Sequence, residues 1–110
     1  TLPLPRKGEA SFDVFTTGRV VGSAATPVGR GVVWQETGVT RNVKGEAPFD
    51  RLEDVCLGHA TVIGDDWTRL YGTCVKTDQD GDQILVTWGD VKEQWSIVGG
   101  TGKYQGITGT

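Results

Sequence analysis

The sequence predicts an all-β domain, built as a sandwich or a barrel. Its β-branched and aromatic runs alternate with turn signals about every ten residues, and no long stretch keeps apolar side chains at helical spacing. Glycine supplies 17 of the 110 residues, roughly twice its ordinary share, which is typical of short strands joined by tight turns. A chain of this length closes one core, so we expect residues 1–110 to form a single domain.

Each expected strand is a run rich in Val, Ile, Thr or aromatic residues, bounded by Gly, Pro, Asp or Asn. In chain order, the expected strands cover residues 10–16, 19–23, 31–42, 52–63, 67–77, 83–88, 93–98 and 104–110. The proline-containing start, residues 1–5, and the segment 42–50 are expected to be irregular. The chain opens without Met, as a trimmed chain or a mature chain after removal of a signal peptide would.

The composition argues against several classes of partner. The net charge is −3 and the 11 Lys and Arg residues form no run, so no nucleic-acid partner is expected. No apolar stretch approaches the ~20 residues of a membrane-spanning helix, so no membrane span is expected. One His and two distant Cys residues do not make a metal site, and the sequence predicts no metal and no cofactor.

The segment Ile63-Gly64-Asp65-Asp66-Trp67 predicts a turn between two long strands. If Gly64–Asp66 form a three-residue loop, residues whose numbers sum to 130 are opposed, and Cys56 faces Cys74. Opposed Cβ atoms lie about 4.5–5.5 Å apart, within reach of a disulfide. Two free buried thiols are the alternative. Because a disulfide needs an oxidising compartment, the protein is expected to be secreted or periplasmic.

These registers divide the central strands into two faces. The bulky face carries Val55, Leu57, His59, Thr61, Ile63, Trp67, Arg69, Tyr71, Thr73, Val75, Val86 and Trp88. The flat face carries Cys56, Gly58, Ala60, Val62, Thr68, Leu70, Gly72, Cys74, Leu85 and Thr87. We expect the bulky face to line the interior and the flat face to be partly covered by another subunit. The opposite assignment is the alternative, and a one-residue slip in either hairpin would produce it.

The only histidine, His59, is opposed to Tyr71 in this register, with Arg69 diagonal to both. This cluster could polarise or protonate a small oxygenated ligand. Alternatively, His59 and Tyr71 form a structural pair that seals one end of the interior.

Glu36 has the same strand parity as Val32 and Trp34. If Trp34 points inward, so does Glu36, and a carboxylate in an aromatic cavity has a raised pKa suited to acid–base chemistry. If that face points outward, Glu36 is a solvated surface acid. The candidate catalytic residues are thus Glu36 and His59, and the candidate ligand-binding residues are Trp34, Trp67, Arg69, Tyr71 and Trp88.

Two further segments are expected to be plain turns. Asp78–Asp82 resembles the opening of a calcium loop, but Thr87 stands where the bidentate Glu of that loop is required. Gly99–Lys103 lacks the spacing of a phosphate-binding loop.

The C-terminal segment also carries a family resemblance. It reads Val98-Gly99-Gly100-Thr101-Gly102-Lys103-Tyr104-Gln105-Gly106-Ile107-Thr108-Gly109. This segment resembles the signature hairpin of the allene oxide cyclase and dirigent barrels, and also a group of uncharacterised exported bacterial proteins. The resemblance is specific over these residues and looser over 31–110. It implies a single antiparallel eight-stranded barrel, lipocalin-like in outline and frequently trimeric, and in this family the chain continues beyond the position of Thr110 into a closing strand.

The expected function is therefore that of an exported barrel, a homo-oligomer (trimer or dimer), that binds a small, largely apolar oxygenated molecule. One alternative is a cyclase or isomerase of the allene oxide cyclase type that uses Glu36 or His59. The other is a structural or interaction protein whose barrel is filled by side chains.

Overall fold

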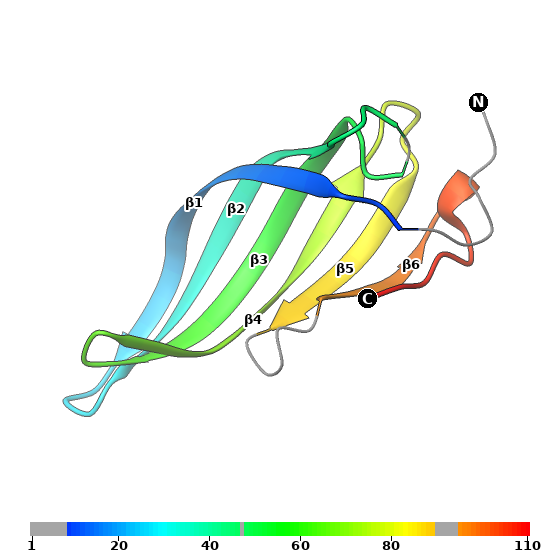
Figure 1. Ribbon diagram of the computed structural model, residues 1–110. Helices are drawn as coiled ribbons and strands as arrows, with labels where there is room; N and C mark the ends of the chain where they lie inside the picture. The colour runs from blue at the N-terminus through cyan, green and yellow to red at the C-terminus, as the bar shows by residue number, and fades with distance from the viewer. Residues whose placement is uncertain (1–8, 47, 90–94) are drawn as a thin grey trace.

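The structure, a computed structural model, describes residues 9–46, 48–89 and 95–110. These residues form one antiparallel sheet in which each strand pairs with the next along the chain (Figure 1). The elements are β1 (Phe12–Ala25), β2 (Arg30–Asn42), β3 (Leu52–Ile63), β4 (Asp66–Thr77), β5 (Gln83–Gly89), β6 (Trp95–Gly100) and the 3₁₀ turn η2 (Gly102–Tyr104). The all-β prediction is confirmed. The part of the chain that the structure describes contains no helix that could cross a membrane.

The described sheet has six strands, not the expected eight, for two reasons. The expected strands 10–16 and 19–23 are one strand, because Gly18 continues β1 opposite Glu36 instead of turning the chain. Segment 104–110 begins at the last residue of η2 and continues through a turn, and Gly109 makes a single bridge to Ile97.

The remaining expected boundaries are close to those observed. The expected strand 93–98 is β6, which begins at Trp95, and residues 93 and 94 lie outside the described part. Segment 42–50 is irregular where it is described, as expected, whereas residues 1–5 lie outside the described part.

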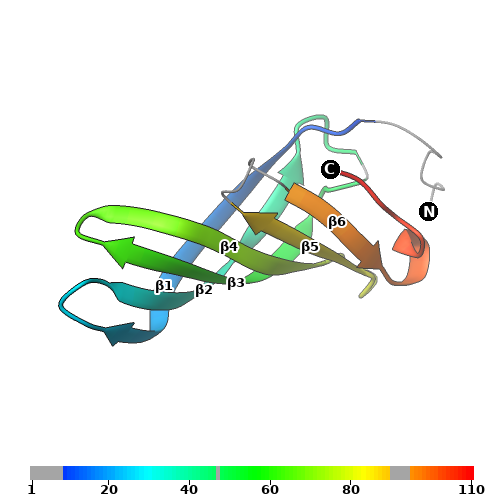
Figure 2. The same ribbon diagram turned by 90° about the horizontal axis from the view of Figure 1, so that it is seen from below.

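The sheet curls but does not close among the described residues (Figures 1 and 2). Its edges, β1 and β6, approach each other through side chains at one end. Phe12 of β1 stacks on Phe49, with ring centroids 4.7 Å apart, and Trp95 of β6 lies 5.5 Å from Phe12 and 5.7 Å from Phe49. Aromatic packing therefore joins the two edges here, where the expected barrel would have backbone hydrogen bonds.

One face of the sheet, which we call the inner face, carries the core. Along β3 every second residue, from Leu52 to Val62, is buried, and the residues between them are partly or fully exposed. The buried core cluster comprises Phe49, Leu52, Cys56, Cys74, Ile84, Val86 and Tyr104. The flat face of β3 is thus the inner face, and its bulky face, which includes His59, is the outer face. The expected face assignment and the expected oligomer contact through Cys56 and Ala60 are both wrong, because the chain itself buries these residues.

The disulfide between Cys56 and Cys74 is confirmed, with the two Cα atoms 4.0 Å apart. The hairpin register differs from the assumed one at its turn. Ile63 opposes Asp66, so only Gly64 and Asp65 form the loop. A β-bulge opposite Ala60 then restores the register that opposes the two cysteines.

Candidate functional site

Three tryptophans meet on the inner face, and one of them, Trp88, also packs against the core cluster. The ring centroid of Trp34 lies 6.1 Å from that of Trp67, at an interplanar angle of 72°, and 6.1 Å from that of Trp88, at 37°. These distances and tilts are typical of favourable aromatic pairs. Trp67 remains 47% exposed, so the cluster presents aromatic surface to solvent.

Two glycines let the indoles lie flat on the sheet. Gly58 opposes Trp34 on the neighbouring strand, and Gly72 opposes Trp88. A Cβ atom at Gly58 would come within 2.4 Å of the Trp34 ring, and one at Gly72 within 2.3 Å of the Trp88 ring. Any side chain at either position would therefore lift an indole off the sheet.

Glu36 lies beside this cluster, as its shared parity with Trp34 predicts. The Trp34 indole Nε1 donates a hydrogen bond of 3.2 Å to Glu36 Oε1. Gly18 of β1 opposes Glu36, and a Cβ at Gly18 would lie 2.9 Å from Glu36 Cγ. Glu36 is half-buried, so the site combines aromatic surface with one hydrogen-bonding carboxylate.

Trp67 and Trp88 reach this face by routes that differ from the sequence prediction. Trp67 opposes the buried Val62, because the bulge at residues 69–70 inverts the alternation between Tyr71 and Trp67. The loop between β4 and β5 spans five residues, and it places Trp88 opposite Gly72. Both were expected on the face of Tyr71, and that expectation is wrong. The Gly-Asp pair at 64–65 was the available signal, since such pairs form two-residue hairpin loops.

His59 and Tyr71 form the expected pair, but on the outer face. Their rings lie 5.0 Å apart at 33°, and His59 Nδ1 is buried with no hydrogen-bond partner among the described residues. Arg69 lies in the bulge with a left-handed φ of 51° and is exposed. The structure therefore separates His59 and Tyr71 from Glu36 and the tryptophans by the thickness of the sheet.

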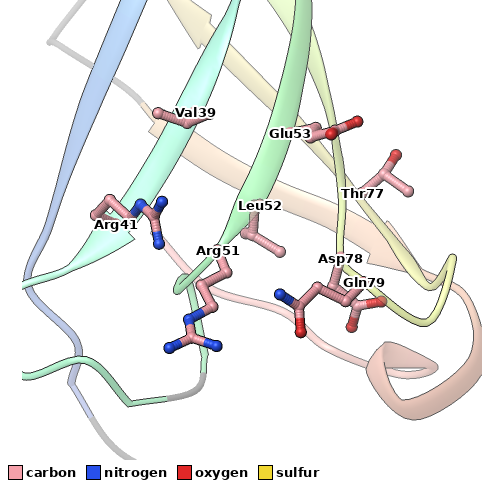
Figure 3. A pocket seen from close by; sticks show the side chains of 8 residues that line it. All are labelled: Val39, Arg41, Arg51, Leu52, Glu53, Thr77, Asp78 and Gln79. Carbon is pink, nitrogen blue, oxygen red and sulfur yellow. The ribbon is translucent and has the colours of Figure 1, made fainter.

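A shallow hollow of about 650 Å³ lies at the end of the sheet opposite the tryptophans, where β2 and β4 end and β3 begins (Figure 3). Its walls carry Val39, Arg41, Arg51, Leu52, Glu53, Thr77, Asp78 and Gln79. Positive and negative groups are mixed there, and none of the candidate site residues predicted from the sequence lines it. We therefore assign it no function.

The Asp78–Asp82 loop folds around an ammonium group. Lys103 Nζ lies 2.5 Å from a carboxylate oxygen of Asp78, 2.7 Å from one of Asp80 and 3.4 Å from one of Asp82. The three carboxylates, within 4.8 Å of one another, are grouped as they would be around a metal ion, but the lysine of this chain occupies their centre. The cluster thus fastens the segment after β6 to the β4–β5 hairpin.

Protonation equilibria reflect this ionic cluster. Burial acts to raise the pKa of Asp78, but hydrogen bonds from Lys103, Tyr104 and two backbone amides outweigh it, so the pKa is lowered. Hydrogen bonds to Asp78 and Asp80 raise the pKa of Lys103. Burial, followed by the hydrogen bond to Asp78, raises the pKa of Tyr104. All three shifts favour the charge states that hold the cluster together at neutral pH.

We expect Lys103→Met to make the fold more stable as the pH falls from 7 to 4, a rise that the unmodified chain does not show. In the unmodified chain, the stabilisation from Asp78 is complete above its ordinary pKa of about 3.9 and is lost as pH falls through its lowered folded pKa. In the variant, the carboxylates repel one another at pH 7 and are relieved as they gain protons. The urea midpoint at pH 7, 5 and 4 should therefore rise with acid in Lys103→Met but not in the exposed control Lys44→Met. Parallel pH profiles for all three proteins would contradict this.

The sequence reasoning missed a buried ion pair on the inner face. Asp54 and Lys76 are opposed on β3 and β4 and are only 1% and 2% exposed. Lys76 Nζ lies 3.3 Å from Asp54 Oδ2 and donates a hydrogen bond of 2.7 Å to the Thr40 hydroxyl, which in turn donates to Asp54 Oδ2. Burial lowers the pKa of Lys76, and the attraction of Asp54 offsets part of that effect. The same sum of 130 that paired the cysteines also pairs these two residues, so the signal was present.

Comparison of the chain with models of known protein families, with curated proteins and with solved structures finds no match. The resemblance to the allene oxide cyclase and dirigent barrels therefore stays a prediction.

Proposed function

We propose that the inner face of the protein binds a small, largely apolar molecule that carries a hydroxyl group. The observation that carries this proposal is the meeting of Trp34, Trp67 and Trp88 beside Glu36. The indoles supply apolar contact, and the carboxylate fixes the orientation of the ligand. A predominantly aromatic wall with few polar groups is the usual composition of a small-molecule site.

The chemistry of Glu36 narrows the class of ligand. An ionised carboxylate only accepts hydrogen bonds, and Oε1 of Glu36 already accepts one from Trp34. The other oxygen is free among the described residues to accept a hydrogen bond from the ligand. The oxygenated group of the ligand is therefore a hydroxyl, as in an alcohol or phenol, and not an ether or a ketone.

We also propose that the protein acts outside the cytoplasm. A disulfide and the absence of a membrane-spanning helix from the described residues are compatible with an extracellular or periplasmic location. A closed eight-stranded barrel is not required for binding, because the three tryptophans already share one face of the open sheet.

The two alternative functions, catalysis and a purely structural role, would require the same residues to act differently. A cyclase or isomerase would have to use Glu36 without His59, which lies on the outer face. A purely structural protein would leave the exposed indole of Trp67 without a ligand. The site geometry favours binding over both.

Titration with 1-octanol and with methyl octyl ether tests this proposal, since only the alcohol can donate a hydrogen bond. Neither probe absorbs light at the wavelengths at which tryptophan absorbs or emits. A change in indole emission therefore reports binding directly. We expect a saturable shift with octanol and roughly ten- to hundredfold weaker binding of the ether, because a hydrogen bond to a charged group contributes about 1.5–3 kcal/mol.

The variant Glu36→Leu should remove the preference for the alcohol, and Trp67→Leu should weaken both probes. Glu53→Leu, which changes an exposed carboxylate of the outer face on β3, is the matched control and should bind like the unmodified protein. The proposal is wrong if neither probe alters the emission, or if Glu36→Leu retains the preference.

A further inference from the structure

The free edge of β1 presents an unpaired row of backbone groups. Within the described sheet β1 pairs only with β2. The carbonyl of Ser11 accepts a hydrogen bond from the Val43 amide, so odd-numbered residues at this end of β1 direct their backbone groups toward β2. Because direction alternates along a strand, the even-numbered residues from 12 to 20 direct their N–H and C=O groups away from the sheet.

The side chains of β1 are also unusually apolar for an exposed edge. Phe15 is 61% exposed and Val20 58% exposed, and Val14 and Val21 are exposed as well. Natural edge strands are commonly short, charged or covered, because a long apolar edge is a template for another strand. β1 has 14 residues, and within the described structure no strand pairs with its free side, which Trp95 of β6 approaches only at Phe12.

We propose that a second copy of the chain pairs antiparallel with β1, with Thr16 opposite the partner's Thr16. In this register opposed residue numbers sum to 32. Every outward-directed residue from 12 to 20 then meets an outward-directed residue of the other copy, which satisfies the free backbone groups. The contact is isologous, as a two-fold dimer requires.

Charge complementarity selects this register over its neighbours. It places Asp13 opposite the partner's Arg19, and by symmetry Arg19 opposite the partner's Asp13. Shifting the register by two residues in either direction faces Asp13 with Thr17 or Val21 instead. Shifts of four residues face Asp13 with the partner's Phe15 or Ser23. Shifts of six oppose the two Asp13 residues or the two Arg19 residues, and like charges directly opposed are destabilising.

The same register gives part of the exposed apolar surface of β1 a fitting neighbour. Val14 faces the partner's Gly18 and Val20 faces the partner's Phe12, whereas Phe15 and Val21 face the partner's Thr17 and Ser11. Since Gly18 also opposes Glu36 within the chain, the partner strand would form a wall next to the tryptophan site. The pairing itself does not rest on the ligand-binding proposal.

A charge-exchange experiment tests the interface. We expect light scattering at micromolar concentration to report a dimer for the unmodified chain. Asp13→Arg and Arg19→Asp should each be monomeric, because both contacts then join like charges. An equimolar mixture of the two variants should restore the dimer, since each contact again joins Arg to Asp. Lys44→Asp, a charge change on an exposed turn outside the edge, should remain dimeric.

Thr16→Pro provides a second route that does not alter charge. It removes an N–H directed at the free edge and leaves the hydrogen bonds to β2 intact, so it should give a folded monomer. The proposal is overturned if the unmodified chain is monomeric. That result is expected if another segment of the same polypeptide pairs with the free edge of β1. It is also overturned if the two charge variants stay dimeric alone, or if they stay monomeric when mixed.

Discussion

Replacing Lys76 with Met is expected to lower the free energy of unfolding by about 3–5 kcal/mol, the usual cost of breaking a buried ion pair by removing one partner. Asp54 would remain buried with only the Thr40 hydroxyl as a hydrogen-bond donor among the described residues. Its other carboxylate oxygen, Oδ1, already lacks a partner there, so little could compensate the remaining charge. Urea unfolding at neutral pH measures the loss.

Removing the whole network should cost much less than removing Lys76 alone. In the triple variant Thr40→Val, Asp54→Val and Lys76→Met, no charged or polar group is left unpaired in the core, and such replacements are often neutral or stabilising. Lys44→Met is the control for losing a lysine at an exposed position and should lie within about 0.5 kcal/mol of the unmodified chain. A loss below about 1 kcal/mol for Lys76→Met would show that the pair is hydrated and not buried.

Reducing the Cys56–Cys74 disulfide is expected to lower the free energy of unfolding by about 3 kcal/mol, from the entropy that the unfolded chain regains. The bridge joins positions 18 residues apart at the centre of the β3–β4 hairpin. Urea unfolding with and without reductant measures this difference. The double variant Cys56→Ala and Cys74→Ala should be less stable than the oxidised chain and should not respond to reductant.

Alkylation of denatured but unreduced protein gives an independent readout of the same bridge. No thiol should react before reduction, and both should react after it. Two alkylated cysteines without reductant would contradict the bridge, and with it the argument for an oxidising compartment.

Part of the candidate site could be predicted because it depends on one strand alone. Trp34 and Glu36 are two residues apart on β2, so they share a face whichever way the sheet is packed. Trp67 and Trp88 lie on other strands, and their faces depend on a bulge and on a five-residue loop. Trp67 and Trp88 were expected on one face, joined by Trp34 if its strand has the same polarity, and the structure brings all three together. Their expected grouping with His59, Tyr71 and Arg69 is wrong.

The strand count shows the same division between local and non-local information. Thr17-Gly18 looks like a turn because glycine punctuates many hairpins, yet here glycine is required by the close approach of Glu36 from β2. Segment 104–110 has residues suited to a strand, but Tyr104 is buried against the β4–β5 hairpin, and Lys103 binds its acidic loop. Only contacts between distant segments distinguish these outcomes.

The sequence alone predicted the all-β class, the central hairpin and the opposition of Cys56 and Cys74, although this opposition also depends on the bulge opposite Ala60. These features follow from residues close together in the chain, where alternation and turn residues act directly. The tertiary structure decided which face is buried, because a sheet has a period of two and a single extra residue in a loop or bulge exchanges its faces. It also decided that Asp54 and Lys76 are buried together, because the same opposed pair would be an ordinary surface ion pair if the sheet were packed on its other face.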